Sequence, residues 1–288
     1  MSQLPTPIVS TGWLAKELEE PRPNLVVVDA SWYLAAMQRD PKAEYLSGHI
    51  PGAIFWDLDA LSEQRSPLPH MLPDPDTLAR QIGALGIGNV HRVVVYDASG
   101  VNLSAPRVWW TFKVAGHDAV SVLDGGFGRW RAEGRPIEQG WRWRAPAHFT
   151  VRFRPELVTS LAELQAALGS GSWQLLDARS RGRFEGTEPE PRPGLRGGHL
   201  PGARNLPFNE LVDAQGLLFP VAELGRRYLA AGVELTQPVV ASCGSGVTAC
   251  ALALGLELLG AEHYSVYDGS WAEWGVAEGP PIESGPPR

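Results

Sequence analysis

The chain has 288 residues, which is enough for two domains of ~100–150 residues, each with its own core. It carries 25 basic and 32 acidic side chains, a formal net charge of −7, and no basic stripe, which argues against a nucleic-acid-binding protein. Its two cysteines are too few for a disulfide framework and fit a reducing compartment.

The N-terminal segment has no basic region followed by an apolar stretch, and the first positive side chain is Lys16. It therefore lacks the pattern of a signal or transit peptide. The most apolar segment, residues 249–261, contains Glu257 and is shorter than the ~18–20 residues that a membrane-spanning helix requires. We expect a soluble, cytoplasmic protein without membrane or nucleic-acid partners.

Three patterns occur in both halves of the chain in the same order: an apolar strand ending in Asp-Ala, a Gly-His-x-Pro-Gly-Ala segment, and an Asp-Gly turn before an aromatic residue. They occupy residues 25–30, 48–53 and 124–127 in the first half, and residues 173–178, 198–203 and 268–271 in the second. The partners Asp29 and Asp177 are 148 residues apart, His49 and His199 are 150 apart, and Asp124 and Asp268 are 144 apart. This near-constant spacing predicts a duplicated domain.

Each half alternates apolar strands with helical segments, which predicts an α/β fold of two domains, each a mostly parallel sheet flanked by helices. Thr159-Ser160 before Glu163 indicates a capping box that starts a helix, and Thr11 takes the equivalent place in the first half. Residues 141–157 lack helical periodicity, and we expect them to be an extended connector whose tryptophans cover a domain surface. The predicted domains are therefore residues 1–140 and 158–288.

The two halves differ at one chemically important position. Residues 93–97 of the first half align with residues 239–243 of the second, so that Asp97 stands where the second half has Cys243. A carboxylate cannot perform thiol chemistry, so we expect a non-catalytic first domain and a catalytic second domain.

Cys243 opens the sequence Cys-Gly-Ser-Gly-Val-Thr between an apolar strand and the apolar run that begins at Ala249. A strand that turns through glycines into a helix points backbone N–H groups and the positive helix end toward one place. Thiols at helix N-termini can have pKa values of ~3.5–7.5 instead of ~8.5, which favours the nucleophilic thiolate. The alternative is that Cys243 is a small buried hydrophobic residue, as many free cysteines are.

With these motifs the chain resembles the tandem-domain rhodaneses over nearly its whole length, and its loop is similar to that of 3-mercaptopyruvate sulfurtransferases. Thiosulfate-preferring relatives place Arg-Lys after the cysteine, whereas this chain has the neutral Gly244-Ser245. The resemblance implies an enzyme in which Cys243 takes sulfur from 3-mercaptopyruvate as a persulfide, releases pyruvate, and passes the sulfur to an acceptor. Thiosulfate is the alternative donor. Thioredoxin, a small thiol, cyanide and a biosynthetic protein are possible acceptors.

The resemblance also assigns the substrate-binding residues. It gives substrate binding to Arg183 and Arg192, whose planar guanidinium groups suit a carboxylate, and to the loop residues Gly244, Gly246, Val247 and Thr248. The alternative for the two arginines is a solvated face in an arginine-rich segment.

A proton relay near the sulfur is expected from the same resemblance. It would consist of Ser245 together with His70 and Asp59 from the first half, which would place the active site between the domains. The alternative is that His70 is a surface histidine between prolines and Asp59 is a helix cap.

Two other classes of function fit these motifs less well. A phosphatase of the Cys-x5-Arg type would need an arginine where this chain has Ala249. A non-catalytic binding module would agree with Asp97 but not with the intact second loop. Neither a metal nor a cofactor is expected, because no Cys/His cluster has ligand spacing and no phosphate-binding lysine loop occurs.

Overall fold

The computed structural model describes residues 7–20, 22–169 and 171–287. The chain forms two compact units, and each takes a short segment from the other half of the sequence. The first unit comprises the described residues of Met1–Gln64, Leu72–Arg154 and Val212–Leu218. The second comprises those of Arg65–Met71, Pro155–Leu211 and Phe219–Arg288. His70 therefore belongs to the second unit, although it precedes that unit in the sequence.

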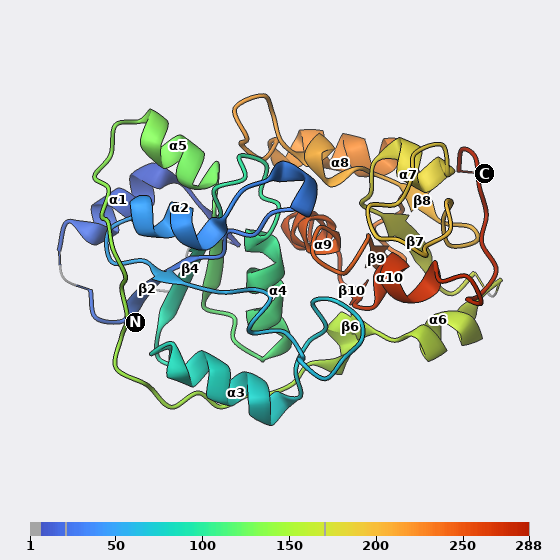
Figure 1. Ribbon diagram of the computed structural model, residues 1–288. Coiled ribbons are helices and arrows are strands. Elements are labelled where there is room, and N and C mark those ends of the chain that lie inside the picture. The colour runs from blue at the N-terminus through green and yellow to red at the C-terminus, as the bar shows by residue number, and fades with distance from the viewer. Residues whose placement is uncertain (1–6, 21, 170, 288) are drawn as a thin grey trace. The chain divides into compact units, whose positions relative to one another are not determined.

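The first unit is built on a five-stranded sheet of order β1-β5-β4-β2-β3 in which every pair is parallel. Its strands are β1 (Ile8–Val9), β2 (Leu25–Asp29), β3 (Ile54–Phe55), β4 (Arg92–Tyr96) and β5 (Val120–Leu123). Its helices are α1 (Thr11–Leu18), η1 (Ala35–Met37), α2 (Pro41–Ser47), α3 (Pro75–Ala84), α4 (Ala105–Val114) and α5 (Gly126–Ala132) (Figure 1).

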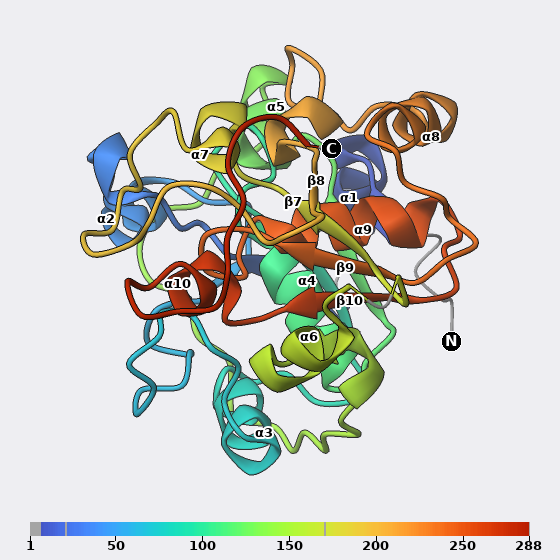
Figure 2. The same ribbon diagram turned by 90° about the vertical axis from the view of Figure 1, so that its right-hand side faces the viewer.

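The second unit repeats this topology with the order β6-β10-β9-β7-β8, again with parallel pairs (Figure 2). Its strands are β6 (Val158–Thr159), β7 (Gln174–Asp177), β8 (Arg204–Asn205), β9 (Val239–Ser242) and β10 (Tyr264–Tyr267). Its helices are η2 (Pro155–Leu157), α6 (Leu161–Ala167), α7 (Arg181–Glu185), η3 (Phe208–Leu211), α8 (Val221–Ala230), α9 (Ala249–Leu258) and α10 (Ser270–Trp274). The predicted duplicated α/β fold is confirmed.

Equivalent helices build equivalent cores. In the first unit, Leu14 of α1 and Trp130 of α5 are buried with Val94 of β4. In the second unit, Leu164 of α6 and Trp271 of α10 are buried with Val240 of β9. A parallel sheet buried on both faces explains why the central strands are continuous apolar runs.

The helix starts agree with the capping chemistry. Ser160 and Glu163 form the predicted capping box at the start of α6, so this prediction is confirmed. In the first unit the cap is Ser10, whose side chain accepts from the Trp13 amide, and Thr11 is the first helical residue. The prediction for Thr11 was therefore wrong by one residue, because a serine at the preceding position already supplies the cap oxygen.

The connector runs along the first unit as backbone without helix or strand from Trp141 to Arg154. The amides of Arg152 and Arg154 donate to carbonyls at the end of α4, at 2.9 and 2.8 Å. Trp141 packs edge-on against Tyr45, as expected, but Trp143 is 84% exposed to solvent, so the expectation was wrong for Trp143. Across the described residues, no helix combines the length and the apolar character that a bilayer span demands.

Candidate active site

Cys243 lies directly after β9, in the loop of residues 243–248 that leads into α9. Its side chain is buried, with 2% of the residue exposed, and both cysteines of the chain are free thiols. Cys250, the second residue of α9, is fully buried, and its Sγ donates to the Gly246 carbonyl at 3.2 Å. The two cysteines therefore have different environments, and Cys250 is a core residue of the helix.

A serine that sequence reasoning missed holds the Cys243 loop in place. Ser270 Oγ accepts hydrogen bonds from the amides of Cys243 and Gly246, both at 3.1 Å, and donates to the Tyr267 carbonyl at 2.8 Å. Ser270 is fully buried and has a φ of +48°, a left-handed conformation that costs a serine ~1–2 kcal/mol. The matching residue in the first half is Gly126, and this difference between the repeats was the available signal.

Arg183 and Arg192 both reach Gly244, the residue that follows Cys243. A Cβ atom placed on Gly244 would lie 3.0 Å from Arg183 Nη2 and 3.7 Å from Arg192 Nη1. Arg192 Nη2 also donates to Ser245 Oγ at 3.3 Å. A side chain at position 244 would occupy the space beside the two guanidinium groups, so glycine there keeps both of them next to the loop.

A buried network of charges positions Arg183. Glu190 accepts from Arg183 Nη2 at 2.7 Å and from Arg179 Nη1 at 2.8 Å, and Arg179 also pairs with Asp177 at 2.6 Å. Burial lowers the pKa of Arg179, but the carboxylates of Asp177 and Glu190 outweigh that effect and leave its pKa raised. Sequence reasoning also missed Arg179 and Glu190 as site residues, because the Glu190 segment has no counterpart in the first half to compare it with.

His70 lies beside Ser245, with His70 Nδ1 2.9 Å from Ser245 Oγ across 175 residues of sequence. Both residues are buried, so His70 is not the surface histidine of the alternative reading. Its φ of +61° is unusual for a residue with a side chain, and such conformations concentrate at functional sites. Asp59 lies in the first unit, where its carboxylate accepts from Trp32 Nε1 at 3.2 Å.

The remaining loop residues contribute mainly through their backbone. Gly246 has a φ of +74°, which lets the chain turn, and its amide donates to Ser270. Val247 is 2% exposed, so that its side chain belongs to the core. Within the described chain, Thr248 forms no side-chain cap of α9, although it occupies the N-cap position. Chemically, the site offers a thiol, a hydroxyl, an imidazole and two guanidinium groups around one loop.

The equivalent loop of the first unit is built around Asp97. The Asp97 carboxylate accepts from the amides of Ser99 at 2.9 Å, Ser104 at 2.9 Å and Ala105 at 2.8 Å. The bonds from Ser104 and Ala105 satisfy amides at the start of α4, which otherwise would lack partners. A carboxylate at this position therefore stabilises the loop and the helix start, as a structural residue does.

Comparison with known proteins gives consistent matches along the chain. The family model of rhodanese-like domains matches residues 10–133 and 160–277. The 3-mercaptopyruvate sulfurtransferase of Homo sapiens is 44% identical over 94% of this chain and 93% of its own. Thiosulfate/3-mercaptopyruvate sulfurtransferase 1, mitochondrial, of Arabidopsis thaliana is also 44% identical, over 96% of this chain and 78% of its own.

A solved structure shows the same fold. SseA from Escherichia coli, whose crystal structure is described with the rhodanese fold of 3-mercaptopyruvate sulfotransferases, matches with a TM-score of 0.84 at 38% identity. The match covers 92% of this chain and 99% of that protein.

Proposed function

The chain belongs to the family of rhodanese-like domains, and on that premise we propose that it is a 3-mercaptopyruvate sulfurtransferase with Cys243 as its nucleophile. The observation that carries the proposal is the convergence of Arg183 and Arg192 on Gly244, the residue after the cysteine. Two fixed guanidinium groups suit a small substrate that carries a carboxylate and a ketone.

In the first half-reaction the Cys243 thiolate attacks the sulfur of 3-mercaptopyruvate. An S–S bond forms, the C–S bond breaks, and its electron pair moves to the carbon to give the enolate of pyruvate. The enolate takes up the proton that the donor thiol loses, so that pyruvate leaves and a persulfide remains on Cys243. The positive end of α9 and the loop amides favour the anionic sulfur species.

In the second half-reaction an acceptor thiolate attacks the outer sulfur of the persulfide. A new S–S bond forms on the acceptor, the S–S bond at Cys243 breaks, and the enzyme thiolate returns. Thioredoxin and small thiols are the acceptors we propose, and cyanide would take the same sulfur as thiocyanate.

Ser245 and His70 are the proposed proton relay. The 2.9 Å contact between His70 Nδ1 and Ser245 Oγ supports this role, since a hydroxyl held by an imidazole can pass a proton to the enolate. Asp59 is proposed as the third member, which would orient the imidazole. If it does so, Asp59→Asn lowers kcat by roughly tenfold or more and leaves KM little changed.

Substrate binding is proposed for Arg183 and Arg192 together with the backbone of Gly244, Val247 and Thr248. Gly246 contributes through the turn that its φ of +74° allows. Its amide is already engaged in the hydrogen bond to Ser270. The neutral Gly244-Ser245 pair favours mercaptopyruvate over the dianionic thiosulfate, although one relative carries both donors in its name.

The test is steady-state sulfur transfer from 3-mercaptopyruvate and from thiosulfate in wild type, Cys243→Ser and Cys250→Ser. We expect a preference for mercaptopyruvate, no transfer by Cys243→Ser, and nearly normal transfer by Cys250→Ser, which controls for removal of a buried thiol. Mass spectrometry of wild type after donor alone should find one additional sulfur on the Cys243 peptide. Activity in Cys243→Ser, or sulfur on Cys250, would contradict the assigned nucleophile.

We further propose that residues 1–140 form the non-catalytic domain, residues 141–157 the connector and residues 158–288 the catalytic domain. A cytoplasmic location is also proposed, on the reducing environment that a persulfide enzyme needs. Fractionation of cells that express the full chain tests this location, and recovery with mitochondria would contradict it.

A further inference from the structure

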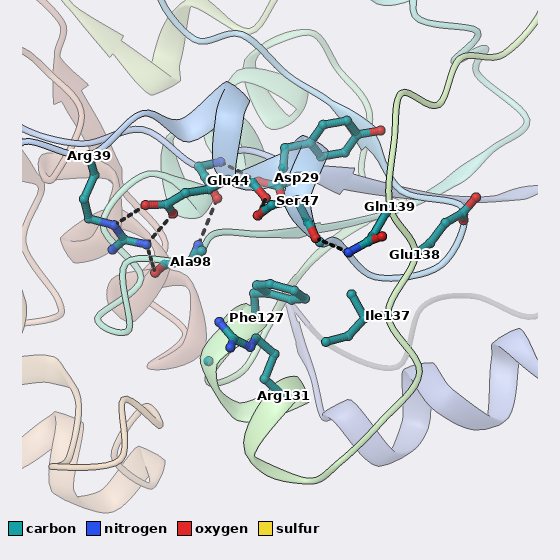
Figure 3. Close-up of a pocket in the computed structure, with 14 residues that line it drawn as sticks. Asp29, Arg39, Glu44, Ser47, Ala98, Phe127, Arg131, Ile137, Glu138 and Gln139 are labelled. Carbon is teal, nitrogen blue, oxygen red and sulfur yellow. Dashed lines mark hydrogen bonds and ion pairs between the residues drawn. The ribbon is translucent and has the colours of Figure 1, made fainter.

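The first unit contains a pocket of ≈ 880 Å³ at the carboxyl end of its sheet (Figure 3). Asp29 at the end of β2, Ser31, Gly48 and Phe127 are among the residues that line it, together with Ala98 from the Asp97 loop. This is the edge of the first sheet that corresponds to the Cys243 edge of the second. The volume is within the range of small-molecule sites.

The two units can be compared residue by residue around this pocket. Asp29, Gly48 and Phe127 correspond to Asp177, Gly198 and Trp271 in the repeated sequence patterns. The correspondence extends to contacts: the His49 ring stacks on Tyr45, and the His199 ring stacks on Phe184. Each histidine Nδ1 also lies 2.8 Å from the backbone carbonyl oxygen of the residue whose ring it stacks on.

In the second unit the equivalent space is filled by the side chain of Arg179. Its guanidinium pairs with Asp177 at 2.6 Å, donates to the Gly198 carbonyl at 2.8 Å, and lies 4.2 Å from the Trp271 ring centroid. It is fully buried. The residue at this position in the first unit is Ser31, so the carboxylate, the glycine and the aromatic ring remain there without the guanidinium.

We propose that the first-unit pocket binds the guanidinium group of an external organic cation, held by Asp29, the Gly48 carbonyl and the face of Phe127. The ligand occupies the position that Arg179 supplies from within the chain in the second unit. A carboxylate paired with a planar fork and an aromatic face is a general recognition mode for guanidinium groups. The pocket has space for the remainder of a larger ligand.

The charges of the pocket support a cationic ligand. Asp29 is 2% exposed, and its Oδ1 accepts from the Ser31 amide at 2.9 Å. Burial raises its pKa to about 6, although hydrogen bonds with Ser31 and Tyr96 act in the opposite direction. Of the two arginines at the pocket, Arg39 is already paired with Glu44. Arg131 is exposed and lies 5.8 Å from the Phe127 ring centroid, on the opposite side of Phe127 from Asp29 in the view of Figure 3.

The experiment is calorimetric titration of the full chain with n-propylguanidine, which reproduces the Arg179 side chain from Cβ outward. We expect saturable binding, and no binding of n-propylurea, which has a similar shape without the charge. Ser31→Arg should abolish binding because the new side chain fills the pocket, and Asp29→Asn should weaken it by roughly ten- to a hundredfold. Arg131→Gln should leave binding equal or tighter, because it removes a competing cation.

A second titration distinguishes the source of the guanidinium. A capped Gly-Arg-Gly peptide that binds at least as tightly as n-propylguanidine indicates an arginine of a protein, and a weaker peptide indicates a free guanidino compound. The proposal is overturned if n-propylguanidine does not saturate, if the urea binds equally, or if Ser31→Arg binds as wild type does. Tighter binding of an anion such as propionate, lost in Arg131→Gln, would also overturn it. Each variant is checked for its melting temperature and for sulfur transfer by Cys243, so that failure here is separate from failure of the proposed function.

Discussion

Replacement of Ser270 by alanine should release the Cys243 loop from its present position while Arg183 and Arg192 stay in place. The substitution keeps the Cβ atom and the left-handed backbone, and it removes the oxygen that accepts from the Cys243 and Gly246 amides. Loss of a buried hydrogen-bond partner costs ~1–3 kcal/mol for each group affected. We therefore expect the free energy of unfolding to fall by about 2–4 kcal/mol.

The catalytic effect should appear in kcat more than in KM. A nucleophile displaced by about 1 Å can lose a factor of ~100 in rate, whereas Arg183 and Arg192 do not depend on Ser270 for their contacts. We expect kcat with 3-mercaptopyruvate to fall roughly 10- to 100-fold at nearly constant KM. Ser270→Gly should be about 1 kcal/mol more stable than Ser270→Ala, because glycine adopts the left-handed conformation without strain.

Ser242→Ala is the matched control, because Ser242 is also a buried serine at this loop. In the described part of the chain its Oγ has no hydrogen-bond partner, so its removal should change neither stability nor kcat appreciably. Urea unfolding and steady-state kinetics measure both quantities. Equal behaviour of Ser270→Ala and Ser242→Ala would refute the assigned role of the Ser270 hydroxyl.

Three further predictions concern charged groups. Arg179→Ala should lower the free energy of unfolding by ~3–5 kcal/mol, since Asp177 and Glu190 lose a buried partner. It should also reduce sulfur transfer, because Glu190 positions Arg183, and added n-propylguanidine should restore part of that activity. Arg183→Lys should raise KM for 3-mercaptopyruvate roughly tenfold, because an ammonium lacks the planar fork, and an unchanged KM would contradict direct binding. Burial raises the pKa of Asp29 from 3.8 to about 6, so the wild type should lose up to ~3 kcal/mol of its free energy of unfolding as the pH rises from 4 to 7. Asp29→Asn should not show this loss. If urea unfolding gives the same pH dependence of stability for both proteins, the prediction is refuted.

Local sequence patterns predicted the features that depend on neighbouring residues. The apolar run of β9 followed by Cys243 and two glycines predicted a strand, a tight loop and a helix, and α9 indeed begins at Ala249. The capping box at Ser160 was predicted because its hydrogen bonds join residues three positions apart. Repetition of the same patterns predicted two similar sheets without any knowledge of how the strands pair.

Features made by distant residues could not be predicted in this way. Ser270 reaches the Cys243 amide across 27 positions, and nothing near Ser270 in sequence indicates that its hydroxyl faces the loop. The pairing of His70 with Ser245 across 175 positions was expected from a family resemblance, since no local pattern specifies so distant a contact.

The sequence by itself determined the duplicated parallel sheets, the loop that Cys243 opens in the second unit, and the presence of Asp97 at the equivalent position of the first. Its strand runs, glycines and caps act over a few residues, so their effects can be derived from composition and spacing. Tertiary structure alone decided how Arg179 fills one pocket and Ser31 leaves its counterpart open. The reason is that a pocket is bounded by side chains from several strands and loops, and its volume depends on which of them meet.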